Sequence, residues 1–371
     1  MSSTTYIPRI HRALVAPGPG SIALKPIPVP PIADDQVLVR VAAVALNPSD
    51  YKLLDQSTTL GAVSGSDFAG TVVRVSSSVS HRVKVGDRIC GFVFGANPGC
   101  PENGAWGQYE AATLDLCMPI PPEMDFATAA SLAMGTATAG LAFRSLGLKW
   151  DGLAVDSAAQ KSASDSSANE DTGKFVLVYG GATATGTLLL QFLRMAGYAP
   201  LTTCSAANFD MVIGRGALHA FDYNAPTCVD DIRTYTGERL AYVLDCIGSI
   251  DTMTLCCSAI GDQGGRYSAL ELYPRLLTIR RRDVVHDWIL GWTLFGAEVQ
   301  LAGAYHRPPM PEDWAFGKQW AEMVSQLIAD GRLQAHPLEI VSGHLSMVIP
   351  SLDRLREGEN ERKKVVVQVQ A

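Results

Sequence analysis

The chain has 371 residues, of which 47% are apolar, and its formal net charge is −7. This length and apolar content predict a folded protein of two domains, each with its own core, and exclude a chain that is disordered throughout. The acidic balance argues against a dedicated nucleic-acid-binding protein, which needs clustered basic surface.

The N-terminal residues lack the apolar core of a signal sequence, and no apolar run is long enough to cross a bilayer. We therefore expect a soluble, cytoplasmic protein with no membrane partner. Its eight cysteines are scattered, mostly among apolar residues, and none forms a CxxC pair. That spacing favours reduced thiols over a disulfide framework.

Residues 10–118 contain short, β-branched segments that glycine and proline interrupt, including 36–45, 70–75 and 87–93. Such spacing predicts a compact domain resembling a β-barrel. From about residue 123 the pattern becomes helical, with Ala, Leu and Met prominent from Ala127 to Ala142. We interpret this helical segment as a bridge to a second domain.

Residues 151–173 are dominated by Ser, Ala and Asp, which predicts a mobile surface insertion. Strands and helices then alternate as far as about residue 300. The predicted strands are 175–179, 199–204, 219–222, 241–246 and 265–270. This alternation predicts an α/β domain with a doubly wound parallel sheet.

After Pro308 and Pro309 the sequence predicts two helices and two further strands. The helices are 314–328 and 345–356, and the strands are 338–341 and 364–369. We expect these strands to return to the N-terminal β domain, since they do not readily extend the parallel sheet. The predicted domains are therefore 1–140 with 308–371, and 141–307.

The strand at 175–179 runs directly into a glycine-rich turn and then into an apolar helix. Against the pattern G-x-G-x-x-G, the glycines fall at Gly181 and Gly186, with Thr183 in the middle position. Turn glycines let backbone N–H groups approach a pyrophosphate, and the helix N-terminus adds a partial positive charge. A turn of this kind also occurs without any nucleotide. The candidate cofactor-binding residues are Gly180, Gly181, Ala182, Thr183, Ala184, Thr185 and Gly186.

The end of the next strand indicates which dinucleotide would bind. An NAD site places Asp or Glu there, whereas this chain has the neutral donors Ser205 and Asn208, with Arg215 and Tyr223 further on. Because this corner has no carboxylate, nothing there would repel a 2′-phosphate. We therefore expect NADPH. Ser205 and Asn208 are equally suited to capping the following helix.

Several motifs together resemble the medium-chain dehydrogenase/reductase superfamily, in which a GroES-like catalytic domain accompanies a Rossmann domain. The motifs are at 45–52, 65–70, 85–88, 104–109, 135–139 and 180–186. Within it, segments 47–52, 134–141, 179–186, 204–210 and 293–298 resemble the trans-acting enoyl reductases of fungal polyketide synthases and polyketide–peptide hybrids, the lovastatin type.

Zinc-dependent members of the superfamily have Cys at the position of Asn47 and His-Glu at Ser66 and Asp67, with four cysteines near residues 95–110. Only Cys100 lies in that window here, and the histidines occur singly. A catalytic zinc needs three protein ligands, so we expect no metal. The architecture then suits hydride delivery to an activated C=C bond, with hydrogen-bond donors stabilising the developing charge.

The resemblance places one segment beside the nicotinamide: Pro48, Ser49, Asp50, Tyr51 and Lys52. Lys52 is the first candidate for a catalytic or positioning donor, and Tyr51 is a weaker one. The alternative for Lys52 is a solvated surface lysine, and the alternative for Asp50 is an aspartate that fixes a turn. No donor for the second carbon stands out, and water remains an option. Val365 and Val366 are also assigned to the cofactor site.

The resemblance implies two groups of substrate contacts. The first is on the bridging helix: Gly135, Thr136, Ala137, Thr138, Ala139, Gly140, Leu141 and Ala142. Thr136 is also a candidate donor to the nicotinamide amide. Small residues here serve close helix packing equally well. The second group is Thr293, Leu294, Phe295, Gly296, Ala297 and Glu298.

The expected activity is NADPH-dependent reduction of an α,β-unsaturated polyketide thioester held on the acyl carrier domain of a partner synthase. Arg280 to Arg282 would suit an acidic carrier domain, or would pair with Asp283 or Asp287. We expect a monomer. A free-standing quinone or enone reductase and a non-catalytic NADPH-binding protein are the alternatives.

Overall fold

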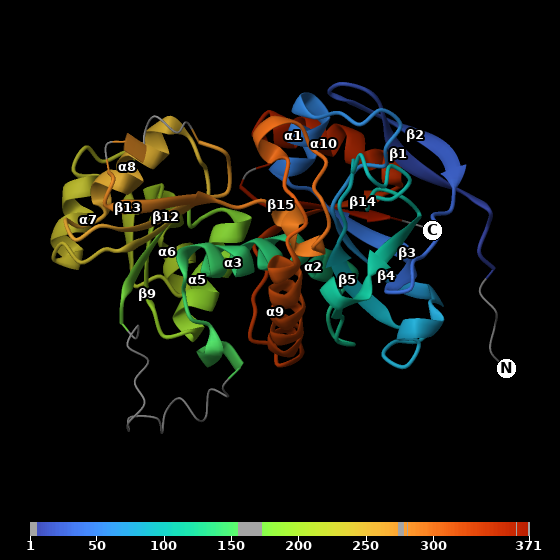
Figure 1. Ribbon diagram of the computed structural model, residues 1–371, viewed down its shortest axis with the longest axis horizontal. Coiled ribbons are helices and arrows are strands. Elements are labelled where there is room, and N and C mark those ends of the chain that lie inside the picture. Colours follow the sequence, from blue (N-terminus) through green and yellow to red (C-terminus); the bar gives the residue numbers. More distant parts are fainter. Residues whose placement is uncertain (1–5, 155–172, 274–277, 280, 361, 370–371) are drawn as a thin grey trace. The chain divides into compact units, whose positions relative to one another are not determined.

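The computed structural model describes residues 6–154, 173–273, 278–279, 281–360 and 362–369 (Figure 1). The chain divides into two compact units, one formed by Met1–Met134 with Trp292–Ala371 and the other by Gly135–Gly291. These boundaries differ from the expected ones, after 140 and after 307. The segment that follows Gly291 belongs to the first unit because Trp292 stacks on Phe94 at a centroid distance of 4.5 Å.

The first unit is built on sheet that is antiparallel except for one parallel pair, Leu338–Gly343 with Lys364–Val369. Its strands are β1 (Ile10–Gly18), β2 (Ser21–Pro28), β3 (Gln36–Ala45), β4 (Asp67–Val75), β5 (Arg88–Phe92), β6 (Tyr109–Thr113), β7 (Met118–Pro119), β14 (Leu338–Gly343) and β15 (Lys364–Val369). Strands β1 and β2 form a two-stranded sheet, and the others follow the order β14-β15-β3-β4-β5-β7, with β6 beside β3.

Strand β3 organises this unit because it has three strand partners. It pairs with β4 along most of its length, with β6 through Gln36–Arg40 and with β15 through Ala43–Ala45. Two shifts in the register with β4 bend the strand. The pairing of β15 with β3 confirms that the C-terminal strands return to the N-terminal β domain.

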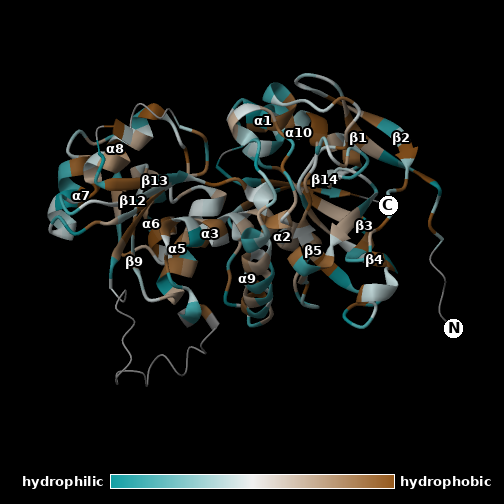
Figure 2. Cartoon of the chain, viewed as in Figure 1, coloured by the Kyte–Doolittle hydropathy of each residue, from teal (hydrophilic) through white to brown (hydrophobic). Residues whose placement is uncertain are grey.

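The helices of the first unit are α1 (Pro48–Gln56), α2 (Phe126–Ala130), α9 (Pro311–Ala329) and α10 (Val348–Arg356), with short 3₁₀ turns η1 (Ser77–Val79), η2 (Leu114–Leu116), η6 (Gly291–Phe295), η7 (Gly303–Tyr305) and η8 (Leu345–Met347). Helix α9 buries Trp320, Val324 and Leu327 and exposes its other face. Figure 2 shows hydrophilic and hydrophobic residues alternating along it.

The second unit contains one parallel sheet. Its strands are β8 (Phe175–Tyr179), β9 (Ala199–Cys204), β10 (His219–Asp222), β11 (Tyr242–Asp245), β12 (Gly265–Ala269) and β13 (Val284–Trp288), in the order β10-β9-β8-β11-β12-β13. Its helices are α5 (Ala184–Met195), α6 (Phe209–Gly214), α7 (Cys228–Thr236) and α8 (Ile250–Ala259), with η3 (Asp151–Ala154) and η4 (Ala206–Asn208). The strand order reverses between β8 and β11, as in a doubly wound sheet. The predicted parallel sheet is confirmed, although β13 was not predicted.

The predicted helical bridge is two helices, α2 and α3 (Ala133–Leu146), which residues 131–132 separate. The stretch Phe126–Leu146 is long and apolar enough to cross a membrane by length and composition, but 83% of its most apolar window is buried within the protein. This burial is typical of a core helix in a folded domain.

The predicted insertion at 151–173 lies largely outside the described residues, because only Asp151–Ala154 and Gly173 at its ends are described. Asp151–Ala154 form η3, in which Leu153 is buried.

Candidate functional site

The glycine turn of the second unit leaves no room for side chains. A Cβ atom at Gly181 would lie 1.9 Å from Thr202 Oγ1, and one at Gly186 would lie 2.5 Å from the carbonyl oxygen of Gly180. The backbone N–H groups of Gly180 and Gly181 donate to Thr203 O at 3.1 and 3.2 Å, which ties the turn to β9. The turn is therefore closely packed at Gly181 and Gly186 and is hydrogen-bonded to β9.

Thr183, which replaces the central glycine of the motif, is the N-cap of α5. Its Oγ1 accepts the N–H of Gly186 at 3.0 Å. Among the described residues, no side chain caps the N–H groups of Ala184 and Thr185 in the same turn. Exposed N–H groups at a helix N-terminus attract anions. The arrangement can therefore hold a phosphate group.

A buried carboxylate organises the neighbouring loop at the point where the strand order reverses. Asp245, at the end of β11, accepts from the N–H groups of Ile247 and Gly248 (both 2.9 Å), Thr252 Oγ1 (2.6 Å) and Tyr267 Oη (2.9 Å). No sequence motif indicated this role, because an Asp at a strand end resembles many others. The four bonds fix the loop that packs beside the glycine turn.

Ser205 and Asn208, the predicted cofactor-binding pair, lie together after β9. Asn208 Nδ2 donates to Ser205 Oγ at 2.9 Å, and both residues are half-buried. They occupy the N-cap positions of η4 and α6, yet neither side chain makes a capping hydrogen bond. Helix capping therefore does not account for these side chains.

Arg215 and Tyr223, two further predicted cofactor-binding residues, differ in their exposure to solvent. Arg215 is the C-cap of α6, is only 8% exposed, and has its pKa lowered by burial. Tyr223 is 38% exposed, and its ring centroid lies 6.1 Å from that of Tyr179. Of the two, Tyr223 has the accessible side chain.

In the first unit, the predicted catalytic segment begins helix α1, with Pro48 and Ser49 in its first turn and Asn47 as its N-cap. Asp50 is 3% exposed and accepts the Asn47 N–H at 2.7 Å and the Ser66 hydroxyl at 2.8 Å. Burial, together with the charge of Asp67, raises the pKa of Asp50 to about 7 against these hydrogen bonds.

The carboxylate of Asp67 lies at the centre of a second buried cluster. It accepts from Asn47 Nδ2 at 2.8 Å, from Lys364 Nζ at 3.0 Å and from the N–H of Met134 at 2.6 Å. Lys364 also donates to Asn47 Oδ1. From the sequence we compared Asn47 and Asp67 with the zinc ligands of other superfamily members, but we did not predict a role for Lys364. Within the described part of the chain, no group of three His, Cys, Asp or Glu residues could hold a metal ion.

Tyr51 and Lys52 follow on α1 and are both half-buried. The Tyr51 ring packs against the core of the unit, and the Arg356 guanidinium lies 5.9 Å from its centroid. Arg356 also binds Asp55 at the far end of the helix, at 3.0 Å. Tyr51 thus has evident packing partners.

The predicted substrate residues of the bridging helix are largely buried. In the stretch 135–142 only Thr138 is partly exposed. A Cβ atom at Gly135 would lie 2.7 Å from Leu188 Cδ1 on α5, so close helix packing explains this glycine.

The second predicted substrate segment, 293–298, is anchored to the first unit. Thr293 and Leu294 are buried, and Phe295 meets Phe92 edge-on at 5.2 Å. Ala297 and Glu298 are exposed, and Glu298 pairs with His306 at 3.0 Å. Gly296, with a φ of 70°, lies between the buried and the exposed parts of this segment.

Two other groups of predicted residues also have structural partners. Arg281 binds Asp283 at 2.7 Å and the carbonyl oxygens of Cys257, Ile260 and Gly261, whereas Arg282 is exposed and Arg280 lies outside the described residues. The Val365 and Val366 side chains are buried in β15, and Val365 O accepts the N–H of Leu46.

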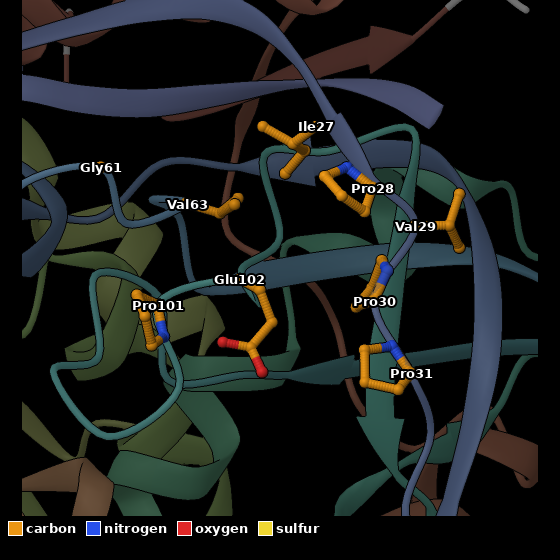
Figure 3. A pocket seen from close by; sticks show the side chains of 9 residues that line it. All are labelled: Ile27, Pro28, Val29, Pro30, Pro31, Gly61, Val63, Pro101 and Glu102. Atoms are coloured by element: carbon orange, nitrogen blue, oxygen red, sulfur yellow. The ribbon is translucent and has the colours of Figure 1, made fainter. Parts of the chain in front are cut away.

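A pocket of about 350 Å³ opens on the first unit. It is lined mainly by apolar residues of 27–31, 61–63 and 101–102, and Glu102 is its one ionisable group (Figure 3). None of the predicted site residues lines it, so it does not bear on the candidate site.

Comparison with known proteins gives the family. Residues 33–122 match the alcohol dehydrogenase GroES-like domain. Trans-enoyl reductase caaB of Aspergillus niger is 40% identical over 370 residues, which are 99% of this chain and all of the relative. The lovastatin nonaketide synthase enoyl reductase component lovC of Aspergillus terreus is 41% identical over 343 residues, 92% of each chain.

The crystal structure of CurK enoyl reductase superposes with a TM-score of 0.74 and 17% identity, covering 97% of this chain and 99% of CurK. This likeness shows the fold, and with the family match it confirms the predicted pair of a GroES-like domain and a doubly wound parallel sheet. The chain belongs to the trans-enoyl reductases, oxidoreductases of the medium-chain dehydrogenase/reductase superfamily that act on C=C bonds.

Proposed function

We propose that this protein transfers hydride from NADPH to the α,β-double bond of a polyketide thioester that a partner polyketide synthase, or a polyketide–peptide hybrid synthase, carries on its acyl carrier domain. The observation that carries the proposal is the 40% identity to a trans-enoyl reductase over 99% of the chain. The name of a second relative links it to a polyketide synthase as the enoyl reductase component.

The second unit suits a nicotinamide dinucleotide. A closely packed glycine turn, and a helix start whose Ala184 and Thr185 N–H groups have no side-chain cap among the described residues, would hold the pyrophosphate. Ser205 and Asn208 would donate to a 2′-phosphate, and no carboxylate occupies positions 205–208 to repel it. When bound, the cofactor supplies the hydride. The unit Gly135–Gly291 is then the NADPH-binding domain, and the remainder is the catalytic domain.

Lys52 is the residue that we assign to the reacting end. Reduction of an enoyl thioester places negative charge on the thioester oxygen, and a preorganised cation or hydrogen-bond donor stabilises that charge. Lys52 is half-buried on α1. Tyr51 is a secondary candidate and Thr136 is a candidate donor to the nicotinamide amide. No residue is assigned as the proton donor to the second carbon, for which water is an option.

We further propose that the protein acts as a cytoplasmic monomer that meets the carrier domain directly. A carrier domain brings its substrate on a phosphopantetheine arm, so the thioester is recognised in part through its attachment. A free enone lacks that attachment.

The test compares turnover with an enoyl group on an acyl carrier domain, the same enoyl group on a pantetheine thioester, a free enone and a small quinone. We expect turnover to fall in that order, with NADPH preferred over NADH. Equal or faster reduction of the quinone or free enone would identify a detoxifying reductase instead. Binding of NADPH without turnover of any substrate would identify a non-catalytic protein.

A further inference from the structure

Lys364 is a buried cation outside the proposed reacting groups. Its side chain is 6% exposed, that of Asp67 is fully buried, and the two form an ion pair at 3.0 Å. Removing an ammonium group from water is costly unless partners satisfy it. Lys364 is the first residue of β15, far along the chain from Asp67 at the start of β4. This pair therefore joins distant segments of the first unit.

The pair also holds the N-terminus of α1. Lys364 donates to Asn47 Oδ1, and Asn47 Nδ2 donates to the same Asp67 carboxylate at 2.8 Å. Asn47 is the N-cap of α1. The next contact, from the Asn47 N–H to Asp50 at 2.7 Å, continues the network into the first turn of the helix.

Lys52 lies on the opposite side of this short helix. Asp50 and Leu54 are the buried residues of α1. Lys52 follows Asp50 by two residues, which is a rotation of roughly 200° about a helix axis. Contacts on the inner face therefore hold the helix backbone that carries Lys52.

We propose that Lys364 is a positioning residue for Lys52. Its ammonium binds Asn47 and Asp67, and through them it fixes the start of α1 and the place of Lys52 during reduction. This inference rests on the role assigned to Lys52 in the proposed function.

The experiment uses paired substitutions, because Lys364→Met alone would leave the Asp67 charge buried and uncompensated. The double variant Lys364→Met/Asp67→Asn removes both charges and keeps the side-chain lengths similar. The matched control is Arg354→Met/Glu339→Gln, which removes another ion pair of the same unit, between α10 and β14. Each pair is also combined with Lys52→Ala.

We expect the Lys364/Asp67 variant to keep the NADPH affinity of the second unit and to lose at least about tenfold in kcat on a pantetheine enoyl thioester, because small misplacements of a reacting group are costly. In the Lys52→Ala background it should cause no further loss. Hydrogen exchange should quicken in residues 47–56. The control pair should leave kcat within about twofold of wild type.

Wild-type kcat in the folded double variant would overturn the proposal, as would an equal loss with and without Lys52. If the double variant does not fold, Lys364→Arg and Lys364→Gln, whose amide still donates a hydrogen bond, are compared instead, and only the arginine variant should retain protection of α1 against exchange. Equal exchange in these two variants would count against the proposal. Failure of the wild type to reduce any enoyl thioester would instead refute the proposed function, and the exchange measurement would still report on α1.

Discussion

Glu110 is a buried acid that the proposed chemistry does not use. It lies on β6, is fully buried, and neither carboxyl oxygen has a hydrogen-bond partner among the described residues. Burial raises its pKa well above the ordinary value of 4.5. Ionising such a group in place is unfavourable, so burial favours the neutral form of Glu110 in the folded protein.

Replacing Glu110 should remove a pH-dependent loss of stability. Because the pKa is raised in the folded state, the stability present below pH 4.5 is lost as the pH rises and the unfolded chain ionises. We expect Glu110→Gln to raise the melting temperature at pH 8 more than at pH 5, measured by calorimetry. The exposed Glu123→Gln is the control. If Glu110→Gln changed the melting temperature equally at pH 5 and pH 8, burial would not be opposing the ionisation of Glu110.

The Ser205–Asn208 corner allows a test of cofactor choice at a single residue. Ser205→Asp places a carboxylate where we expect a 2′-phosphate, and repulsion should weaken NADPH binding at least about tenfold while NADH binding changes little. Fluorescence titration of both cofactors measures this. Ser205→Ala separates loss of the hydroxyl from the added charge. A parallel loss of NADH and NADPH affinity would place the 2′-phosphate elsewhere.

At the scale of elements, strand β8, the glycine turn and helix α5 form a strand–turn–helix motif. Its geometry requires glycines, which have no Cβ atom. We expect Gly186→Ala to destabilise the second unit by about 1–3 kcal/mol and to weaken NADPH binding, because its Cβ would meet Gly180 O at 2.5 Å. Gly214→Ala, on α6 with nothing within 4 Å of its Cβ, is the matched control. Equal effects of the two substitutions on the melting temperature would contradict this account.

The elements that the sequence predicted best are those buried on both faces. The central strands β8 and β9 begin and end at the predicted residues because continuous apolar runs mark central strands of a parallel sheet. Strand β13 was missed since it is an edge strand with His286 and Asp287 among its residues. The break at residues 131–132 was missed because alanine-rich sequence on both sides continues the helical pattern.

At the scale of the whole molecule, the two units have separate hydrophobic cores. The cluster around Phe68 and Trp106 belongs to the first unit, and the cluster around Leu177 and Tyr267 to the second. Separate cores allow the units to respond separately to a ligand.

NADPH should therefore stabilise the second unit in particular. At a concentration of 100 times Kd, a ligand that binds only the folded state adds about 2.7 kcal/mol. We expect slower hydrogen exchange in β8 and β9, with β1 and β2 of the first unit as an internal reference. Equal protection of all four strands would indicate that the units unfold together.

The sequence by itself determined the two-domain α/β architecture, the glycine turn, the neutral corner at Ser205 and Asn208, and the family. These properties follow from local patterns of apolar periodicity, turn residues and short motifs. Only the tertiary structure showed that Lys364 meets Asp67 and Asn47, that Asp245 fixes the loop beside the turn, and that Glu110 is buried with no hydrogen-bond partner among the described residues. Such contacts join residues far apart in the chain, and their charges and burial arise only when the strands pair.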